Sequence, residues 1–398
     1  MIKESRISEI NSRQAKTSTK SKDSQLQNDL ENLEDEMQSG DMNLRRKAAL
    51  IAQERKRLGL DGLVGGLEAV IINTEPQLQQ AAVEELLRYT GLEFQGAFQD
   101  SGFRTYVLKV PGSSIFHSAD FLIRSRRQGE NPFREINDAQ KTRDRPNTRL
   151  ETFVFETKDI ERYVSIQQSR GIRFLTDMAQ DCGHYLFIQT EPSAFTGNSL
   201  GLLQWKKERG NYLSKDCEPL DLMLAKPNLG HLENIRWLDH AATRVRAQER
   251  DAAILEFMSL TDYNFDFAIY VQSLNSITSV ARLSSRDFAM VFTSGIAPYV
   301  SDEASGPTEK FIQNYGTRVH HIAFQTEQID ETYQALKRDG MRFLVELVGS
   351  PEEGLKQTFS EGSKNTLLVT EYIHRYGGFD GFFTKSNVTL LTAATGKQ

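Results

Sequence analysis

Three residues in the second half of the 398-residue chain, His240, His321 and Glu371, could together bind a metal ion. Glu371 lies in the apolar run 367–373, where an unpaired buried carboxylate would be costly and a cation would offset that cost. Two neutral imidazoles and one carboxylate form a 2-His-1-carboxylate triad, which leaves adjacent coordination positions open on a non-haem Fe(II) ion. The alternative for Glu371 is an ion pair with Arg375 or another cation.

An internal repeat distinguishes the two histidines from the other histidines of the chain. Four stretches, each a short strand followed by a helix, align at Ala69, Thr152, His240 and His321. The offsets between halves nearly agree, at 171 residues for the first and third positions (240 − 69) and 169 for the second and fourth (321 − 152). Such self-similarity indicates a repeated architecture. Because only the second half has histidine at these positions, we expect the first half to be a scaffold.

The pattern predicts an α+β fold of four βαβββ modules, paired into two open β-barrel-like domains. We expect an N-terminal domain over residues 61–208, a linker over 209–234 and a catalytic domain over 235–398. Residues 1–60 form a charged extension that we expect to be partly disordered and partly helical, with Asp41 as the N-cap of a helix that ends at Leu58.

The composition excludes several classes of protein. A net charge of −6 gives no electrostatic basis for binding nucleic acid. No apolar run approaches the roughly 20 residues that span a bilayer, so we expect no membrane partner. Two cysteines are too few for a disulfide framework, and the N-terminus lacks a signal-peptide pattern. The protein is therefore expected to be cytoplasmic, and we expect a homo-oligomer, either a dimer or a tetramer.

Five segments resemble the 4-hydroxyphenylpyruvate dioxygenase family of the vicinal-oxygen-chelate superfamily, within a similarity that covers roughly residues 61–385. The segments 238–240 and 314–324 resemble those that carry the family's two histidine ligands. The segment 371–375 is similar to its Glu-x-Ile-Gln-Arg strand, with His374 in place of glutamine. The segments 357–360 and 378–383 resemble a Gln-Ile-Phe stretch and a shortened glycine-rich motif that leads into a gating helix.

The resemblance implies a function and a set of site residues. It implies that Fe(II) is held by His240, His321 and Glu371, and that an aromatic 2-oxo acid and O2 are the small-molecule partners. The implied reaction converts 4-hydroxyphenylpyruvate and O2 into homogentisate and CO2, a step of tyrosine catabolism. Gln357 is implied to bind the polar groups of the substrate, and three phenylalanines are implied to form the walls around its ring: Phe359, Phe379 and Phe383.

Departures from the family's pattern leave alternatives open. The family's Asn-Glu-Pro segment falls near residues 292–295, which puts Thr293 at the substrate, and the stretch 306–309 lacks both of the family's glutamines. A hydroxymandelate-synthase-like enzyme, or a dioxygenase for another 2-oxo acid, would use the same iron site. A non-catalytic protein that binds a metal or a small molecule on this fold is the alternative from another class.

Two neighbours of the predicted ligands also call for an interpretation. His320 precedes His321 and is expected on the opposite face of its strand, either supporting the ligand or at the surface. Asp239 precedes His240 and is expected to be a turn residue or a solvent-facing acid.

Overall fold

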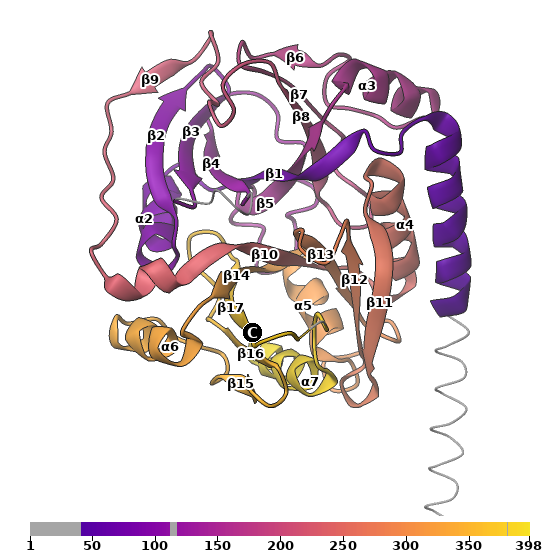
Figure 1. Ribbon diagram of the computed structural model, residues 1–398, viewed down its shortest axis with the longest axis vertical. Helices are drawn as coiled ribbons and strands as arrows, with labels where there is room; N and C mark the ends of the chain where they lie inside the picture. The colour runs from indigo at the N-terminus through magenta and orange to yellow at the C-terminus, as the bar shows by residue number, and fades with distance from the viewer. Residues whose placement is uncertain (1–40, 112–117, 380) are drawn as a thin grey trace, which may run out of the picture. The chain divides into compact units, whose positions relative to one another are not determined.

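The computed structural model describes residues 41–111, 118–379 and 381–398 (Figure 1). The chain divides into two compact units, residues 1–50 and 51–398. A helix covers residues 41–58, so its predicted end is confirmed, but Asp41 is already helical and is not the N-cap. The predictions for residues 1–40 lie outside the described residues. Among the described helices, none is both long enough and apolar enough to cross a membrane.

The larger unit contains two mixed β-sheets. The first sheet has the strand order β6-β7-β8-β5-β1-β4-β3-β2-β9 among the described residues. Its strands come from the first half of the chain: β1 (Val64–Asn73), β2 (Glu93–Gln99), β3 (Phe103–Lys109), β4 (Asp120–Arg126), β5 (Arg149–Thr157), β6 (Gln180–Asp181), β7 (Tyr185–Gln189), β8 (Ser199–Trp205) and β9 (Glu218–Leu220).

The second sheet has the order β11-β12-β13-β10-β14-β17-β16-β15 and comes from the second half. Read from β2, the first sheet shows the same order, with β9 as one additional strand paired to β2. The strands of the second sheet are β10 (Ile235–Arg244), β11 (Asn264–Val271), β12 (Ser276–Arg282), β13 (Ala289–Ser294), β14 (Arg318–Thr326), β15 (Val348–Ser350), β16 (Leu355–Phe359) and β17 (Val369–Arg375).

Each half consists of two βαβββ modules, as the repeat predicted. One helix follows the first strand of each module: α2 (Gln79–Tyr89), α3 (Ile160–Ser169), α4 (Arg250–Leu260) and α6 (Ile329–Arg338). The first strands of the paired modules lie side by side, β1 against β5 and β10 against β14, both antiparallel. This pairing brings the repeated positions of each half to the centre of its sheet.

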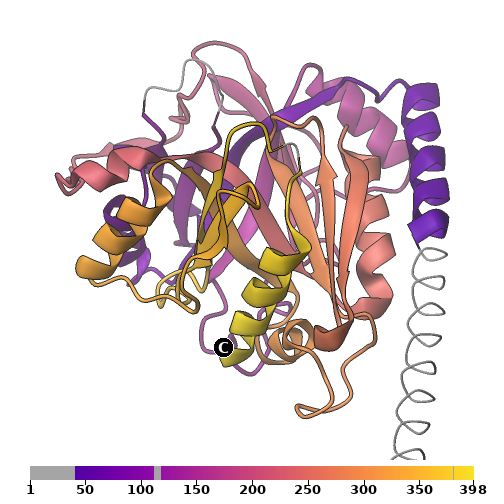
Figure 2. The ribbon, with the colours of Figure 1, turned by 60° about the horizontal axis from the view of Figure 1, so that its bottom comes forward.

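Two further helices belong to the second half, α5 (Pro307–Tyr315) and α7 (Lys385–Ala394). Helix α7 contacts β11 at one edge of the second sheet and β15 and β16 at the other. It therefore closes the open side of this curved sheet, and Figure 2 shows it lying across that side in yellow. The position of α7 makes the inner face of the sheet a buried site.

The inner face of the first sheet is filled by its own side chains. Tyr185, Trp205 and Tyr212 make edge-to-face contacts with one another, with ring centroids 5.3 to 6.0 Å apart. They belong to an apolar cluster that also contains Ala69 and Val154. The first half is thus packed where the second half carries the predicted ligands, which is consistent with a scaffold.

Some elements differ from the prediction. Within residues 341–344, Phe343 pairs in an isolated bridge with Ser360 and no named strand forms. Neither helix α5 nor the short strand β15 was predicted. Strand β9 pairs within the range expected to be a linker.

Candidate metal centre

The three predicted ligands come from adjacent strands in the middle of the second sheet. His240 on β10 pairs with Ala323 on β14, and Ala323 pairs in turn with Glu371 on β17. His321 lies two residues before Ala323 on β14. Residues at paired positions, and residues two apart on one strand, point to the same face of a sheet. The register therefore directs all three side chains to the inner face beneath α7.

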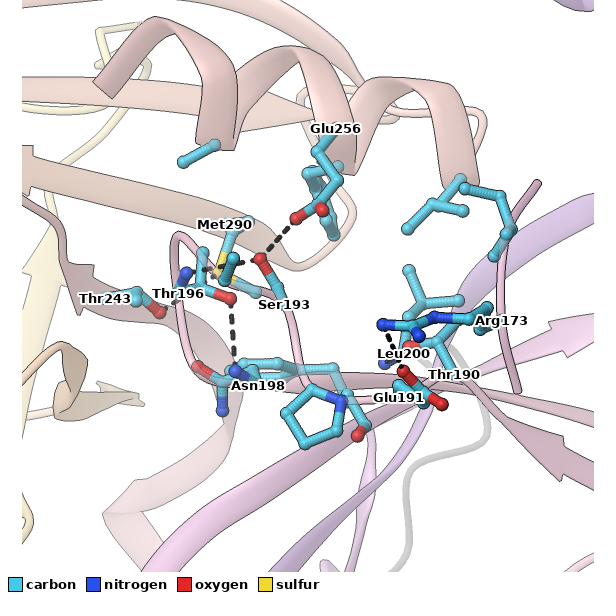
Figure 3. A pocket seen from close by; sticks show the side chains of 18 of the residues that line it. Arg173, Thr190, Glu191, Ser193, Thr196, Asn198, Leu200, Thr243, Glu256 and Met290 are labelled. Atoms are coloured by element: carbon cyan, nitrogen blue, oxygen red, sulfur yellow. Dashed lines mark hydrogen bonds and ion pairs between the residues drawn. The ribbon is translucent and has the colours of Figure 1, made fainter. Parts of the chain in front are cut away.

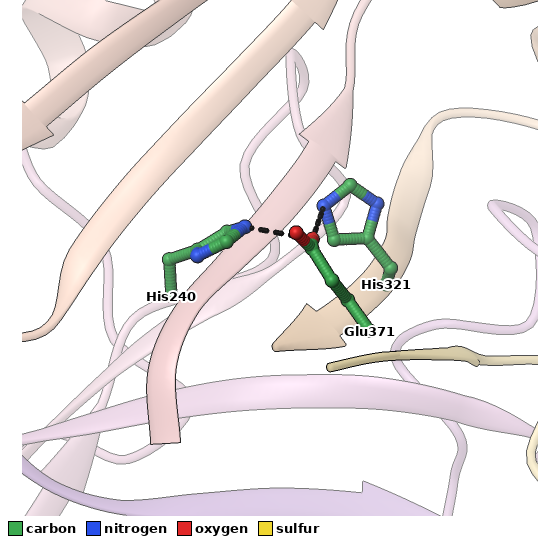
Figure 4. A group of neighbouring side chains, drawn as sticks. All are labelled: His240, His321 and Glu371. Carbon is green, nitrogen blue, oxygen red and sulfur yellow. Dashed lines mark ion pairs between the residues drawn. The ribbon is translucent and has the colours of Figure 1, made fainter. Parts of the chain in front are cut away.

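Their potential ligand atoms meet at one point (Figure 4). The Nε2 atoms of His240 and His321 lie 3.0 and 3.2 Å from the same carboxylate oxygen, Oε2 of Glu371. One ligand atom from each residue falls within a group no more than 4.8 Å across. All three residues are buried. Among the described residues, they are the one such group of His, Cys, Asp and Glu that could hold a metal ion.

A hydrogen bond to Asp239 sets the tautomer of His240. The register of β10 against β14 shifts between Leu238 and His240, and this irregularity lets the Asp239 carboxylate reach Nδ1 of the next residue, at 2.8 Å. Arg375 holds the same carboxylate from the other side, at 2.5 and 3.0 Å. A carboxylate accepts, so Nδ1 of His240 carries the proton and Nε2 presents a lone pair. The prediction that Asp239 is a turn residue or a solvent-facing acid is wrong. The residue belongs to β10 and is buried between Arg375 and His240.

A second relay sets the tautomer of His321. Nε2 of His320 lies 2.7 Å from the side-chain oxygen of Gln398, so this nitrogen donates. Nδ1 of the neutral His320 is then an acceptor, and it lies 2.8 Å from Nδ1 of His321. His321 therefore donates through Nδ1 and presents the lone pair of Nε2 to Glu371. Of the two positions expected for His320, support of the ligand agrees with this geometry. A surface position does not, because His320 is buried.

The second carboxylate oxygen of Glu371 is also held. The Gln357 amide donates to Oε1 of Glu371 at 2.6 Å. Asn387 of α7 donates in turn to the Gln357 oxygen at 3.1 Å. Arg375, the alternative partner for Glu371, pairs with Asp239 instead. Glu371 therefore keeps Oε2 free to face the two imidazoles.

The pKa values of the two histidines differ because only one has a carboxylate on each side. Burial lowers the pKa of His240, but the charges of Glu371 and Asp239 outweigh burial and raise it to about 9. Burial, together with the neighbouring imidazoles and Arg244, holds the pKa of His321 well below its ordinary value.

The residues fit a divalent cation. Nε2 of His240 is fully buried and has no hydrogen-bond partner, although an acceptor oxygen lies 3.0 Å away. Three buried lone pairs that face one another are satisfied by a cation bound between them. Two imidazoles and one carboxylate are also the facial donor set of non-haem Fe(II) sites.

Aromatic rings surround the triad. Phe359 lies against the His321 ring, with centroids 4.7 Å apart. Phe382 and Phe383, just before α7, lie 5.5 and 5.2 Å from the His240 ring. The cavity next to the triad has a volume of about 40 Å³. The rings and α7 therefore enclose a small, largely dry space.

The structure places the other predicted site residues as follows. Thr293, Gln357, Phe359 and Phe383 line the cavity beside the triad. Phe379 does not; it packs on the cluster that contains Ala323 and Ile373. Asp380, within the glycine-rich segment, lies outside the described residues. Sequence reasoning did not find Arg244, Asp239, Phe382 or Asn387 as parts of the site, although Asp239 and Phe382 adjoin predicted residues.

Comparison with known proteins finds similarity in structure alone. No family model and no curated protein matches the sequence. A triple mutant of 4-hydroxymandelate synthase from Streptomyces coelicolor superimposes with a TM-score of 0.61 at 14% identity, over 84% of this chain and 99% of that one. A xylose isomerase-like TIM barrel/4-hydroxyphenylpyruvate dioxygenase fusion protein gives 0.60 at 16% identity, over 89% of this chain and 58% of that one.

These similarities confirm the predicted fold class. The chain has the α+β vicinal-oxygen-chelate fold of these two proteins, with its modules paired into two sheets. It spans little more than half the length of the fusion protein. A shared fold supports many chemistries, so function has to be argued from the site.

Proposed function

We propose that the protein is a non-haem Fe(II) dioxygenase that acts on a 2-oxo acid, with His240, His321 and Glu371 as the iron ligands. One observation carries the proposal: two imidazole lone pairs and one carboxylate oxygen converge in a buried site, and each ligand is oriented by a hydrogen bond on its far side. Orientation of ligands by such partners is typical of functional metal sites.

The bound iron would supply chelation of the 2-oxo acid and activation of O2. The chain's own residues hold the ligands and exclude water. Asp239 keeps the His240 ring in place, and Gln357 fixes the Glu371 carboxylate. Phe359, Phe382 and Phe383 line the imidazoles with apolar surface, which strengthens electrostatic interactions inside the site.

The resemblance in sequence names a first substrate to test. The balanced reaction is 4-hydroxyphenylpyruvate plus O2 giving homogentisate plus CO2, and one structural neighbour carries this dioxygenase in its name. Formation of a hydroxymandelate is the second candidate, because the other neighbour is a 4-hydroxymandelate synthase. A non-catalytic metal-binding role on this fold is the third. The cytoplasmic location and the homo-oligomer remain predictions.

Substitution of one ligand tests the proposal. His321→Ala removes one of three ligands while the strand pairing of β14 is kept, so we expect O2 consumption with any 2-oxo acid to fall at least a hundredfold and Fe(II) affinity to fall with it. His231→Ala, on the short 3₁₀ helix Gly230–Asn234, is the matched control and should behave as the unmodified protein. Full O2 consumption by His321→Ala would refute the assignment.

A further inference from the structure

Arg244 is a buried cation in the wall of the same cavity. It is the last residue of β10 and is only 4% exposed. Its side chain lines the cavity together with His321, Glu371 and Gln357. Burial lowers the pKa of Arg244 to about 9, while Glu309 opposes the shift. A guanidinium with this much burial normally has a carboxylate partner.

Arg244 has no such partner within the described part of the chain. One guanidinium nitrogen donates to the Thr308 hydroxyl at 2.6 Å, and the group lies over the Phe311 ring at 5.2 Å. Its Nε is buried and lacks an acceptor. Oε1 of Glu309 accepts hydrogen bonds from the backbone amides of Gly295 and Ala247. The cation therefore retains donor capacity beside the cavity, and an anion there would satisfy it.

The inner face of the sheet is organised in rows that match a particular shape of ligand. The ligand row contains His240 and Glu371. The next row, two residues further along β10, has His321 of β14 at one end and apolar side chains along the rest: Ala242, Val291 and Val280. The third row is polar: Arg244, Thr293 and Thr278. From His240 to Arg244 is four residues, about 13 Å between Cα atoms.

We infer that Arg244 binds a second, distal carboxylate of the substrate, so that the substrate class is a short 2-oxo dicarboxylic acid. The inference rests on the proposed function. The 2-oxo acid group lies at the triad, the short carbon chain crosses the apolar row, and the distal carboxylate meets Arg244 and the neighbouring threonine hydroxyls.

The test compares two acids of equal chain length, 2-oxoglutarate and 2-oxopentanoate, together with 4-hydroxyphenylpyruvate. Each is titrated anaerobically into the Fe(II)-loaded protein, and its Kd is read from the visible charge-transfer band and from calorimetry. We expect 2-oxoglutarate to bind at least tenfold more tightly than either other acid. Arg244→Gln should remove this preference. The Kd of 2-oxoglutarate should rise about tenfold to a hundredfold, and the Kd of 2-oxopentanoate should change by less than twofold.

Two further variants sharpen the result. Arg246→Gln makes the same change on an exposed arginine two residues away and should leave all three Kd values unchanged. Arg244→Lys keeps the charge and should retain part of the preference, which guards against a folding defect in Arg244→Gln. Unchanged Fe(II) binding by calorimetry identifies a folded variant.

Two results would overturn the inference. One is equal or tighter binding of 2-oxopentanoate or 4-hydroxyphenylpyruvate by the unmodified protein. The other is an equal loss of affinity for all three acids in both Arg244 variants. That result would place the guanidinium at the 2-oxo acid group, which all three acids share. Failure of the proposed function looks different: Fe(II) would bind, and none of the acids would produce a charge-transfer band.

Discussion

At the scale of single residues, the size of the central side chain separates the two halves. In the second sheet, Ala323 lies between His240 and Glu371 in one row. The corresponding row of the first sheet has Val154 between Ala69 and Gly201. A Cβ on Gly201 would lie only 3.0 Å from a Val154 methyl. A large central residue thus excludes large neighbours, and a small one lets two ligands meet above it.

Ala323→Val therefore tests the geometry of the metal site. The two added methyl groups lie between the His240 and Glu371 side chains and push them apart. We expect Fe(II) affinity to fall at least tenfold, with a loss of about 1–3 kcal/mol in the free energy of unfolding from overpacking. Calorimetry with Fe(II) and urea unfolding measure the two effects.

The control is Val154→Ala at the matching position of the first sheet. It should lower the free energy of unfolding by about 2 kcal/mol, because it creates a cavity, and it should leave Fe(II) affinity unchanged. Equal Fe(II) affinity in Ala323→Val and the unmodified protein would contradict the claim that a small residue at position 323 is needed for His240 and Glu371 to meet.

The sequence was sufficient to predict the three residues that meet in the buried site, His240, His321 and Glu371, but not the residues that orient them. The repeat placed His240 and His321 at equivalent positions, and the apolar run around Glu371 indicated a need for a cation. The role of Asp239 depends on an irregularity in β10, and that of Gln398 on a contact 78 residues away from His320. Strand alternation alone cannot predict either one.

At the scale of elements, α7 completes the site through Asn387. This residue donates to the Gln357 oxygen and packs beside Gly349 of β15. Gly349 has a φ of +86°, and a Cβ there would lie 2.0 Å from the Leu355 oxygen and 2.6 Å from the Asn387 amide nitrogen. Gly349 therefore leaves room for both the Leu355 carbonyl of β16 and the Asn387 side chain of α7.

Gly349→Ala should displace α7, and Gly340→Ala supplies a matched control. Both glycines have positive φ, so each alanine carries a backbone penalty of about 1–2 kcal/mol. Nothing lies within 4 Å of a Cβ at Gly340. We expect Gly349→Ala to lose at least about 1 kcal/mol more in urea unfolding, with faster amide hydrogen exchange in α7. Unchanged hydrogen exchange in α7 of Gly349→Ala would contradict a close contact between Gly349 and α7.

Strand and helix positions in the modules were predicted well because they follow hydrophobic periodicity. Helix α5 was not predicted, although Gly306 and Pro307 mark its start and proline is common in the first turn of a helix. Helix α7 contains several weak helix formers, among them Ser386, Asn387 and Val388. Its burial against both edges of the sheet stabilises it, which is a tertiary effect.

At the scale of the whole larger unit, two equivalent arginines join the halves. Arg149 begins β5 and Arg318 begins β14, with an offset of 169 residues (318 − 149) that equals the offset of the repeat. Arg149 donates to the Thr317 carbonyl at 2.5 Å, and Arg318 donates to the Thr148 carbonyl at 2.7 Å. The first half thus holds the start of the strand that carries His321.

A second cavity, of about 260 Å³, lies between the halves beside α4 (Figure 3). Glu256 of α4 points into it and accepts a hydrogen bond from the Ser193 hydroxyl. Burial raises the pKa of Glu256 above its ordinary value, and Ser193 opposes the shift only in part. The folded protein therefore holds a proton on Glu256 at pH values where the unfolded chain has released it.

Glu256→Gln should change how stability depends on pH. Between the ordinary glutamate pKa and the raised folded value, the free energy of unfolding of the unmodified protein falls as pH rises. The variant lacks this contribution, so its stability should fall less steeply over the same range in urea unfolding from pH 4.5 to 8. Glu331→Gln, on an exposed face of α6, is the control. Parallel curves for Glu256→Gln and the unmodified protein would refute the role of burial.

The central claim is that the triad holds iron with positions open to a 2-oxo acid and O2. The most direct measurement loads the protein with Fe(II) anaerobically, adds a 2-oxo acid, and records the visible spectrum before and after O2 is admitted. The account predicts a weak charge-transfer band that decays with release of one CO2 per O2 consumed, and neither event in His321→Ala. Fe(II) binding without a band for 2-oxoglutarate, 2-oxopentanoate or 4-hydroxyphenylpyruvate would contradict it and favour a non-catalytic binding protein.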